Sequence, residues 1–224
     1  MKDNTIASVY PKNSNPFGVG YESYVQKFWQ WLLSIPAATN PVLDRTGDHC
    51  GEAQAGTLVF NLAFSNMGGA ERRCTLPYGK VILCVPNVVL CTDKEFPGAD
   101  EEELSRLAER DESSDPFVFL SVDAIPFNQL RSIRPGEELE DLKEFRTRTK
   151  GFHVNYTKDS PFGPEGDALA VADGYYVMID ALEPGEHVII SEARLTNPDT
   201  KKLFYSDRVK YTITVLEDQT SKDP

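Results

Sequence analysis

The sequence lacks the marks of several large protein classes. No run approaches the ~20 apolar residues that a membrane-spanning helix needs. Basic residues are in the minority, since 23 Lys and Arg face 35 Asp and Glu, for a net charge of -12. A nucleic-acid-binding protein needs a basic surface to displace counterions from phosphates. The composition therefore predicts a soluble, acidic protein with no membrane span and no nucleic-acid partner. It weakly favours divalent cations such as calcium.

Catalytic and cofactor-binding motifs are also missing. There is no G-x-x-x-x-G-K-[ST] and no G-x-S-x-G, and Gly18-Val19-Gly20 follows no strand. The acidic runs lack the D-x-D-x-D-G spacing of a calcium loop. The histidines are too scattered to indicate a metal centre: His49, His153 and His187. No catalytic, cofactor-binding or metal-ligating residue is therefore predicted.

Cysteine is scarce and confined to the first half of the chain, at Cys50, Cys74, Cys84 and Cys91. Four cysteines allow three pairings, and their intervals are not those of zinc ligands. They are candidate disulfides in an exported protein and buried thiols in a cytoplasmic one. The printed N-terminus has no apolar signal region, so a cytoplasmic location is expected. Secretion is expected instead if the natural chain carries a signal ahead of the printed sequence.

What the sequence does contain is a series of strand patterns. Apolar residues alternate over residues 57–64, and residues 80–90 are almost continuously apolar. Pro and Gly, 15 of each, fall between such runs as turn residues. Further strands are expected at residues 72–76, 117–124, 152–157, 175–182, 187–195 and 209–215. Strands at this spacing predict a mainly β fold, a two-sheet antiparallel β-sandwich of the jelly-roll or Ig-like type.

Helical spacing is limited to a few segments. Aromatic residues recur at helical intervals from Tyr21, and Pro36 ends this N-terminal aromatic helix. Trp31 lies on the apolar stripe and is expected in the core, whereas Trp29 lies off it. Short acidic surface helices are expected within 98–114 and 137–145. The predicted organisation is an extended N-terminal segment (1–20), a single β-sandwich domain (21–216) and a flexible tail (217–224).

Several motifs resemble a family of uncharacterised bacterial and archaeal β-rich proteins, which are often secreted. The matching stretches include F-W-Q-W-L-L-S-I-P-A-A-T-N-P-V-L-D at 28–44 and D-G-Y-Y-V-M-I-D-A-L-E-P-G-E-H-V-I at 173–189. Members typically carry W-x-W-x-x-S-I-P, N-P-x-x-D and C-x-x-x-Q-x-G. The resemblance implies a β-rich fold and no established activity. It also implies that Cys84 is a local addition, since members often have Phe-Pro there.

The densest group of polar residues lies in the 44–56 loop, with Asp44, His49, Glu52 and Gln54. Loops carry function, so this group is a candidate hydrolase or lyase site, closed by Arg72 and Asn87. His49 and Cys50 do not form a natural nucleophile pair, because adjacent residues of an extended chain point apart.

Three other features bear on function. Asp44 with Glu52, or Asp173 with Asp180, is a candidate carboxylate pair for glycoside hydrolysis, although Asp173-Gly174 is more simply predicted as a turn. Trp29 is a candidate platform for a sugar or a partner.

Three functions follow as hypotheses. The favoured one is a non-catalytic β-sandwich that binds a protein partner or associates with itself, because strands are abundant and catalytic spacings are missing. The alternatives are the hydrolase or lyase with its site in the 44–56 loop, and a calcium-stabilised extracellular module.

Overall fold

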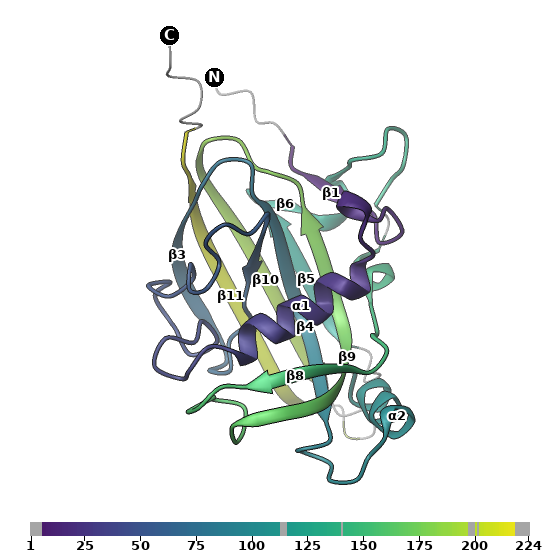
Figure 1. The fold of residues 1–224 in the computed structure, drawn as a ribbon. Helices are drawn as coiled ribbons and strands as arrows, with labels where there is room; N and C mark the ends of the chain where they lie inside the picture. Colours follow the sequence, from purple (N-terminus) through teal and green to yellow (C-terminus); the bar gives the residue numbers. More distant parts are fainter. Residues whose placement is uncertain (1–5, 113–115, 140, 197–199, 201, 218–224) are drawn as a thin grey trace.

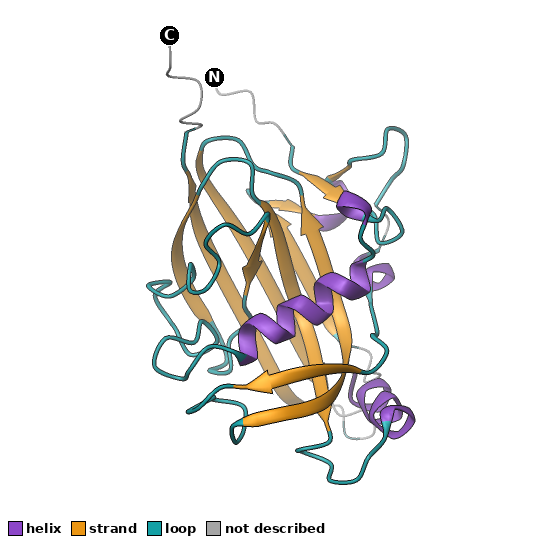
Figure 2. Cartoon of the chain, in the orientation of Figure 1, coloured by secondary structure: helices purple, strands orange, loops and turns teal. Residues whose placement is uncertain are grey.

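The computed structural model describes residues 6–112, 116–139, 141–196, 200 and 202–217. These residues form a mainly β structure with two mixed sheets, as Figures 1 and 2 show. Two α-helices lie among them, α1 (Tyr21–Leu33) and α2 (Glu101–Glu112). The mainly β class and both helices confirm the sequence prediction. The end of α1 also agrees with it, because Pro36 follows shortly after the last helical residue.

The first sheet has the order β2-β4-β9-β1-β7, and β8 also pairs with β9. Its strands are β1 (Ser8–Tyr10), β2 (Val59–Leu62), β4 (Val81–Thr92), β7 (Arg131–Ser132), β8 (Phe152–Tyr156) and β9 (Gly166–Ile179). The second sheet has the order β3-β11-β10-β5-β6. Its strands are β3 (Ala70–Leu76), β5 (Phe117–Val122), β6 (Ile125–Pro126), β10 (Gly185–Thr196) and β11 (Leu203–Val215). Three short 3-10 turns complete the described elements: η1 (Pro16–Gly18), η2 (Phe127–Gln129) and η3 (Leu142–Phe145).

The expectation of purely antiparallel sheets is wrong for three strand pairs. The long pairs β4–β9, β10–β11 and β10–β5 are antiparallel, but β1–β7, β2–β4 and β3–β11 are parallel. The chain leaves the first sheet after β2, runs through β3 in the second sheet, and returns as β4. A parallel pair such as β2–β4 needs a crossover connection of this kind rather than a tight hairpin.

The two sheets share one core. Phe60 and Leu83 of the first sheet belong to the same buried cluster as Ile189 and Tyr211 of the second. Helix α1 lies across the first sheet (Figure 2) and packs on β8 and β9. Helix α2 has a smaller core of its own, in which Leu104 meets Cys91 and Val171.

Three segments differ from the sequence prediction. Strand β9 runs straight through Asp173-Gly174, where a turn was predicted. Gly174 is needed there because its φ is +149° and a Cβ would lie 2.5 Å from the carbonyl oxygen of Asn87. Within 137–145 the described residues form only η3 rather than an acidic α-helix. Residues 6–20 are more than an extended lead-in, since β1 joins the first sheet between β9 and β7. Of the predicted tail, residues 218–224 lie outside the described residues.

Candidate functional site

The 44–56 segment is held together by the carboxylate of Asp44. Its Oδ1 accepts hydrogen bonds from the backbone N–H of Thr46 (2.8 Å) and Gly47 (2.9 Å), and its Oδ2 accepts one from His49 N–H (2.9 Å). The Thr46 hydroxyl donates a further bond to Oδ1. Burial alone raises the pKa of Asp44, but the hydrogen bonds outweigh it and hold the pKa below its usual value. This carboxylate therefore organises the loop rather than facing a substrate.

Gln54 and Arg72, two further candidates, are also occupied by the backbone. The buried Gln54 amide donates to the carbonyls of Cys50 and Asn61 and accepts from Asn61 N–H. Arg72 is only 1% exposed, and its guanidinium donates to the carbonyls of Asp44, Ala63 and Phe64. Both side chains satisfy buried or edge-facing backbone groups, which is a structural role.

His49 and Glu52 complete the predicted cluster and stand apart from it. Glu52 is exposed and His49 is half-buried, and neither side chain has a hydrogen-bond partner within the described part of the chain. The Glu52 carbonyl accepts a hydrogen bond from Trp31 Nε1 (2.9 Å). Of the two residues expected to close the loop, Arg72 contacts Asp44, whereas the Asn87 amide donates to Glu112 instead.

One disulfide pins this segment to the second sheet. Cys50 is bonded to Cys74 of β3, with a Cα–Cα distance of 6.0 Å. Cys84 and Cys91 are buried free thiols. Burial raises the pKa of both, that of Cys91 to about 12, so neither is a ready nucleophile at neutral pH. The four cysteines thus combine the two expected arrangements, one bridge and two thiols.

A buried charge cluster lies where β4, β9 and α2 meet. Asp173 is fully buried and accepts two hydrogen bonds from the Arg146 guanidinium, at 2.9 and 2.8 Å. Glu112 at the end of α2 is 1% exposed, and burial raises its pKa to about 7. Asp180 accepts from the Tyr10 hydroxyl, so the suggested pair of Asp173 and Asp180 has separate partners.

Trp29 lies on a cavity of about 410 Å³, a size within the usual range for small-ligand sites. Its indole N–H donates to the buried Tyr176 hydroxyl (2.9 Å), which fixes the ring. Helix α1, strands β4 and β8 and the loop around 162–164 supply the walls. We call this space the aromatic cavity, and it is lined by Trp29, Leu90, Thr92, Lys94, Glu95, Tyr156, Phe162, Gly163 and Pro164.

The rim of the aromatic cavity carries one charge of each sign. Lys94 Nζ donates to the carbonyls of Pro164 (3.0 Å) and Glu165 (2.8 Å) and lies 5.5 Å from the centre of the Tyr156 ring. Glu95 is exposed, and partial burial raises the pKa of its carboxyl. No hydrogen bond to the Glu95 carboxylate occurs among the described residues. The cavity therefore offers an apolar floor and polar groups at its mouth.

The burial of the two tryptophans is the reverse of what the helical pattern predicts. Trp29 is 3% exposed and in the core, while Trp31 is only partly buried and packs on the core edge. The reason is that α1 is covered on two sides, since the sheet lies below it and Phe64 and Phe162 contact Trp29. Trp29 was found from the sequence, but Tyr156, Phe162 and Lys94 were not. Each lies far from Trp29 along the chain, and no local pattern marks them.

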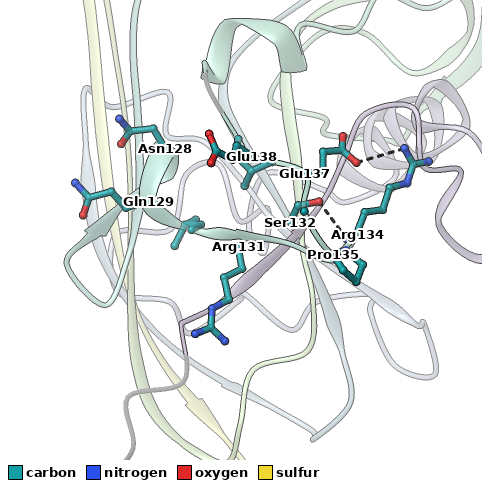
Figure 3. A pocket seen from close by; sticks show the side chains of 11 residues that line it. Asn128, Gln129, Arg131, Ser132, Arg134, Pro135, Glu137 and Glu138 are labelled. Atoms are coloured by element: carbon teal, nitrogen blue, oxygen red, sulfur yellow. Dashed lines mark hydrogen bonds and ion pairs between the residues drawn. The ribbon is translucent and has the colours of Figure 1, made fainter.

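A second hollow is wider and more open. It measures about 640 Å³ and lies beside β7 and the 134–139 loop (Figure 3). Its mouth is polar, and Arg134 is already paired with Glu137 (3.5 Å) and donates its backbone N–H to the Ser132 hydroxyl. Most of its lining side chains are exposed. The hollow has the character of a solvated surface rather than of an enclosed site.

No family model, curated protein or solved structure matches this chain. The resemblance to the family of β-rich bacterial and archaeal proteins therefore stays a prediction. No helix among the described residues is long and apolar enough to cross a membrane. Within the same residues, no three His, Cys, Asp or Glu side chains gather into a group that could hold a metal ion.

Proposed function

We propose that the protein is a non-catalytic binding protein, built as a β-sandwich of its two mixed sheets, that takes a small ligand in the aromatic cavity. The supporting observation is the cavity itself, with a fixed Trp29, the ring of Tyr156 and the half-buried Phe162 around about 410 Å³. Aromatic faces favour flat or ring-shaped partners, whether an aromatic compound or the apolar face of a sugar.

The rim narrows the chemistry of this ligand. Lys94 has three N–H donors and gives two of them to backbone carbonyls, which leaves one for a ligand. Glu95 supplies acceptor oxygens beside it. The ligand we propose is thus a compact ring compound that carries a hydrogen-bonding or charged group at its edge.

The contacts of the 44–56 loop favour a structural role for this loop over a catalytic one. Asp44 and Gln54 give their polar atoms to the backbone, so an acid–base pair there lacks its best-placed members. We also propose that the protein works in an oxidising compartment, because disulfides such as Cys50–Cys74 persist there.

The test is a ¹H–¹⁵N NMR titration of the full chain with four probes: indole, phenol, L-phenylalanine and methyl β-D-glucoside. We expect saturable shifts of the backbone amides of Leu90, Lys94 and Phe162 with at least one probe. The blocking variant is Gly163→Leu, because a Cβ at Gly163 lies 3.5 Å from the Tyr156 ring and a longer side chain fills the cavity. Its matched control is Gly51→Leu, where a Cβ meets nothing within 4 Å.

Binding that disappears in Gly163→Leu and persists in Gly51→Leu supports the proposal. If none of the four probes binds, or if Gly163→Leu binds as the wild type does, the aromatic cavity is not the ligand site.

A further inference from the structure

Strands β2 and β3 both lie at a sheet edge, and the 44–56 segment covers them. Strand β2 ends the first sheet and β3 ends the second. An edge strand presents unpaired N–H and C=O groups, on which another chain can pair. In a parallel pair, alternate residues turn both groups outward. In β2 one such outward residue is Asn61, and in β3 one is Arg73.

The cover satisfies these outward groups as a neighbouring strand does. The Gln54 amide accepts from Asn61 N–H (2.6 Å) and donates to Asn61 C=O (3.1 Å), so one side chain replaces one opposing residue. At β3, Arg73 N–H donates to the Thr46 carbonyl (2.7 Å). Gly47 lies so close that a Cβ there is 2.4 Å from the Arg73 carbonyl oxygen. We call residues 44–56 the edge cover.

The edge that the cover hides on β2 has the composition of a self-pairing strand. Residues 57–64, TLVFNLAF, contain no charge and no proline and are rich in β-forming residues. The outward stretch of β3 is different, since Glu71 and Arg73 carry charge there. A second copy of this chain is therefore best accommodated at β2.

The Cys50–Cys74 disulfide, which we call the latch, joins the edge cover to the second sheet. Cys50 lies in the cover and Cys74 in the edge strand β3, so the disulfide limits how far the cover can leave either edge. A dithiol reductant opens it by giving two electrons and two protons to the disulfide, which yields two thiols and the oxidised reductant. The remaining ties of the cover are hydrogen bonds.

We propose that the disulfide-latched edge cover conceals a self-association surface, and that once the latch is open β2 pairs antiparallel with β2 of a second copy. A two-fold axis relates identical strands in such a pair, which is the commonest symmetry of homodimers. This inference does not depend on the ligand proposed for the aromatic cavity.

The experiment compares the full chain in four forms by analytical ultracentrifugation over a range of concentrations. They are the oxidised wild type, the wild type in dithiothreitol, the Cys50→Ala/Cys74→Ala variant, and that variant with Val59→Lys. Val59 is half-buried on the edge strand, so a lysine there places a charge on the strand that must pair, which opposes edge-to-edge association. The reduced wild type differs from the oxidised wild type only in its disulfide, so it tests the role of that bond without any substitution. Circular dichroism checks that each form is folded. Cys91→Ser in dithiothreitol is a control: if it dimerises as the reduced wild type does, the dimer does not depend on the free thiol of Cys91.

Hydrogen exchange at the amides of Asn61 and Arg73 reports separately whether the cover opens. We expect the oxidised wild type to be monomeric. In the reduced wild type and in the Cys50→Ala/Cys74→Ala variant, we expect these amides of the monomer to exchange at least about tenfold faster than in the oxidised wild type. We also expect both of these forms to dimerise. Adding Val59→Lys abolishes the dimer. The proposal is overturned if the amides stay protected after reduction, if they open while the chain stays monomeric, or if the dimer survives Val59→Lys.

Discussion

Replacing Glu112 by glutamine tests the electrostatics of the buried cluster most sharply. Glu112 is 1% exposed at the end of α2 and accepts one hydrogen bond from the Asn87 amide, at 2.8 Å. The net pKa of Glu112 rises from 4.5 to about 7, chiefly because of burial; the hydrogen bond from Asn87 acts against the rise, Asp173 adds to it, and Arg146 also opposes it. Glutamine keeps the shape of the glutamate side chain and an acceptor oxygen for Asn87, but its amide does not ionise.

The sign of the effect follows from linkage. The folded state holds the Glu112 proton more tightly than the unfolded state does. The stability from this group is therefore complete below pH 4.5 and is lost as the pH rises to about 7. At about 1.4 kcal/mol per pKa unit, the rise to about 7 corresponds to a total loss of about 3 kcal/mol. The Glu112→Gln variant escapes this loss, so its advantage over the wild type grows with pH.

Urea unfolding of both proteins at several pH values between 4.5 and 8 measures this difference. We expect the free energy of unfolding of the variant, relative to that of the wild type, to increase by about 3 kcal/mol between the acidic end and pH 8. Glu102→Gln, an exposed carboxylate on the same helix, is the control and is expected to show no such trend. A difference that stays constant across the range refutes the assignment of Glu112 as a buried, proton-retaining carboxyl.

Three further changes, two of them with a control substitution, test other parts of the structure. Arg146→Ala leaves Arg148, whose Nε lies at 3.7 Å, as the remaining ion-pair partner of the buried Asp173 within the described residues, and is expected to cost about 3–5 kcal/mol in chemical unfolding. Arg106→Ala removes an exposed pair with Glu103 and is expected to shift the unfolding midpoint far less than Arg146→Ala does, so equal losses contradict the burial argument. Gly174→Ala forces a Cβ to 2.7 Å from the Val88 Cα at a φ of +149°, and we expect a lower melting temperature than for Gly51→Ala. Asp44→Asn places an amide N–H against His49 N–H and should cost about 1–2 kcal/mol; an unchanged denaturation midpoint at neutral pH argues that the Asp44 carboxylate does not hold the 44–56 loop together.

Local features of the fold could be predicted from the sequence because their causes are local. The helical spacing from Tyr21 and the stop at Pro36 set α1 within two residues. The alternation in 209–215 places Val209, Tyr211 and Ile213 in the core, as observed. These patterns depend on one element and one buried face.

The arrangement of strands could not be predicted, because it depends on contacts far apart in the chain. Alternation marks a strand but does not say which of two sheets it joins, so the parallel β2–β4 and β3–β11 pairs were missed. Asp173-Gly174 has the composition of a turn, and the hydrogen bonds from Arg146, 27 residues away, let that aspartate lie inside β9.

The candidate site, like the fold, could be predicted only in part. The polar cluster of the 44–56 segment was recognisable, yet its role depends on backbone groups of β2 and β3 that no sequence pattern reveals. Trp29 was identified as a candidate contact because it lies off the helical stripe. The rest of the aromatic cavity comes from segments more than 60 residues further along the chain.

A crystal structure of the wild-type protein soaked with the tightest-binding of the four probes tests the central claim most directly. We predict that the ring of the probe lies in the aromatic cavity against Phe162, with its polar edge toward Lys94 or Glu95. Density for the probe in the open hollow of Figure 3, with the aromatic cavity empty, would contradict the proposed function.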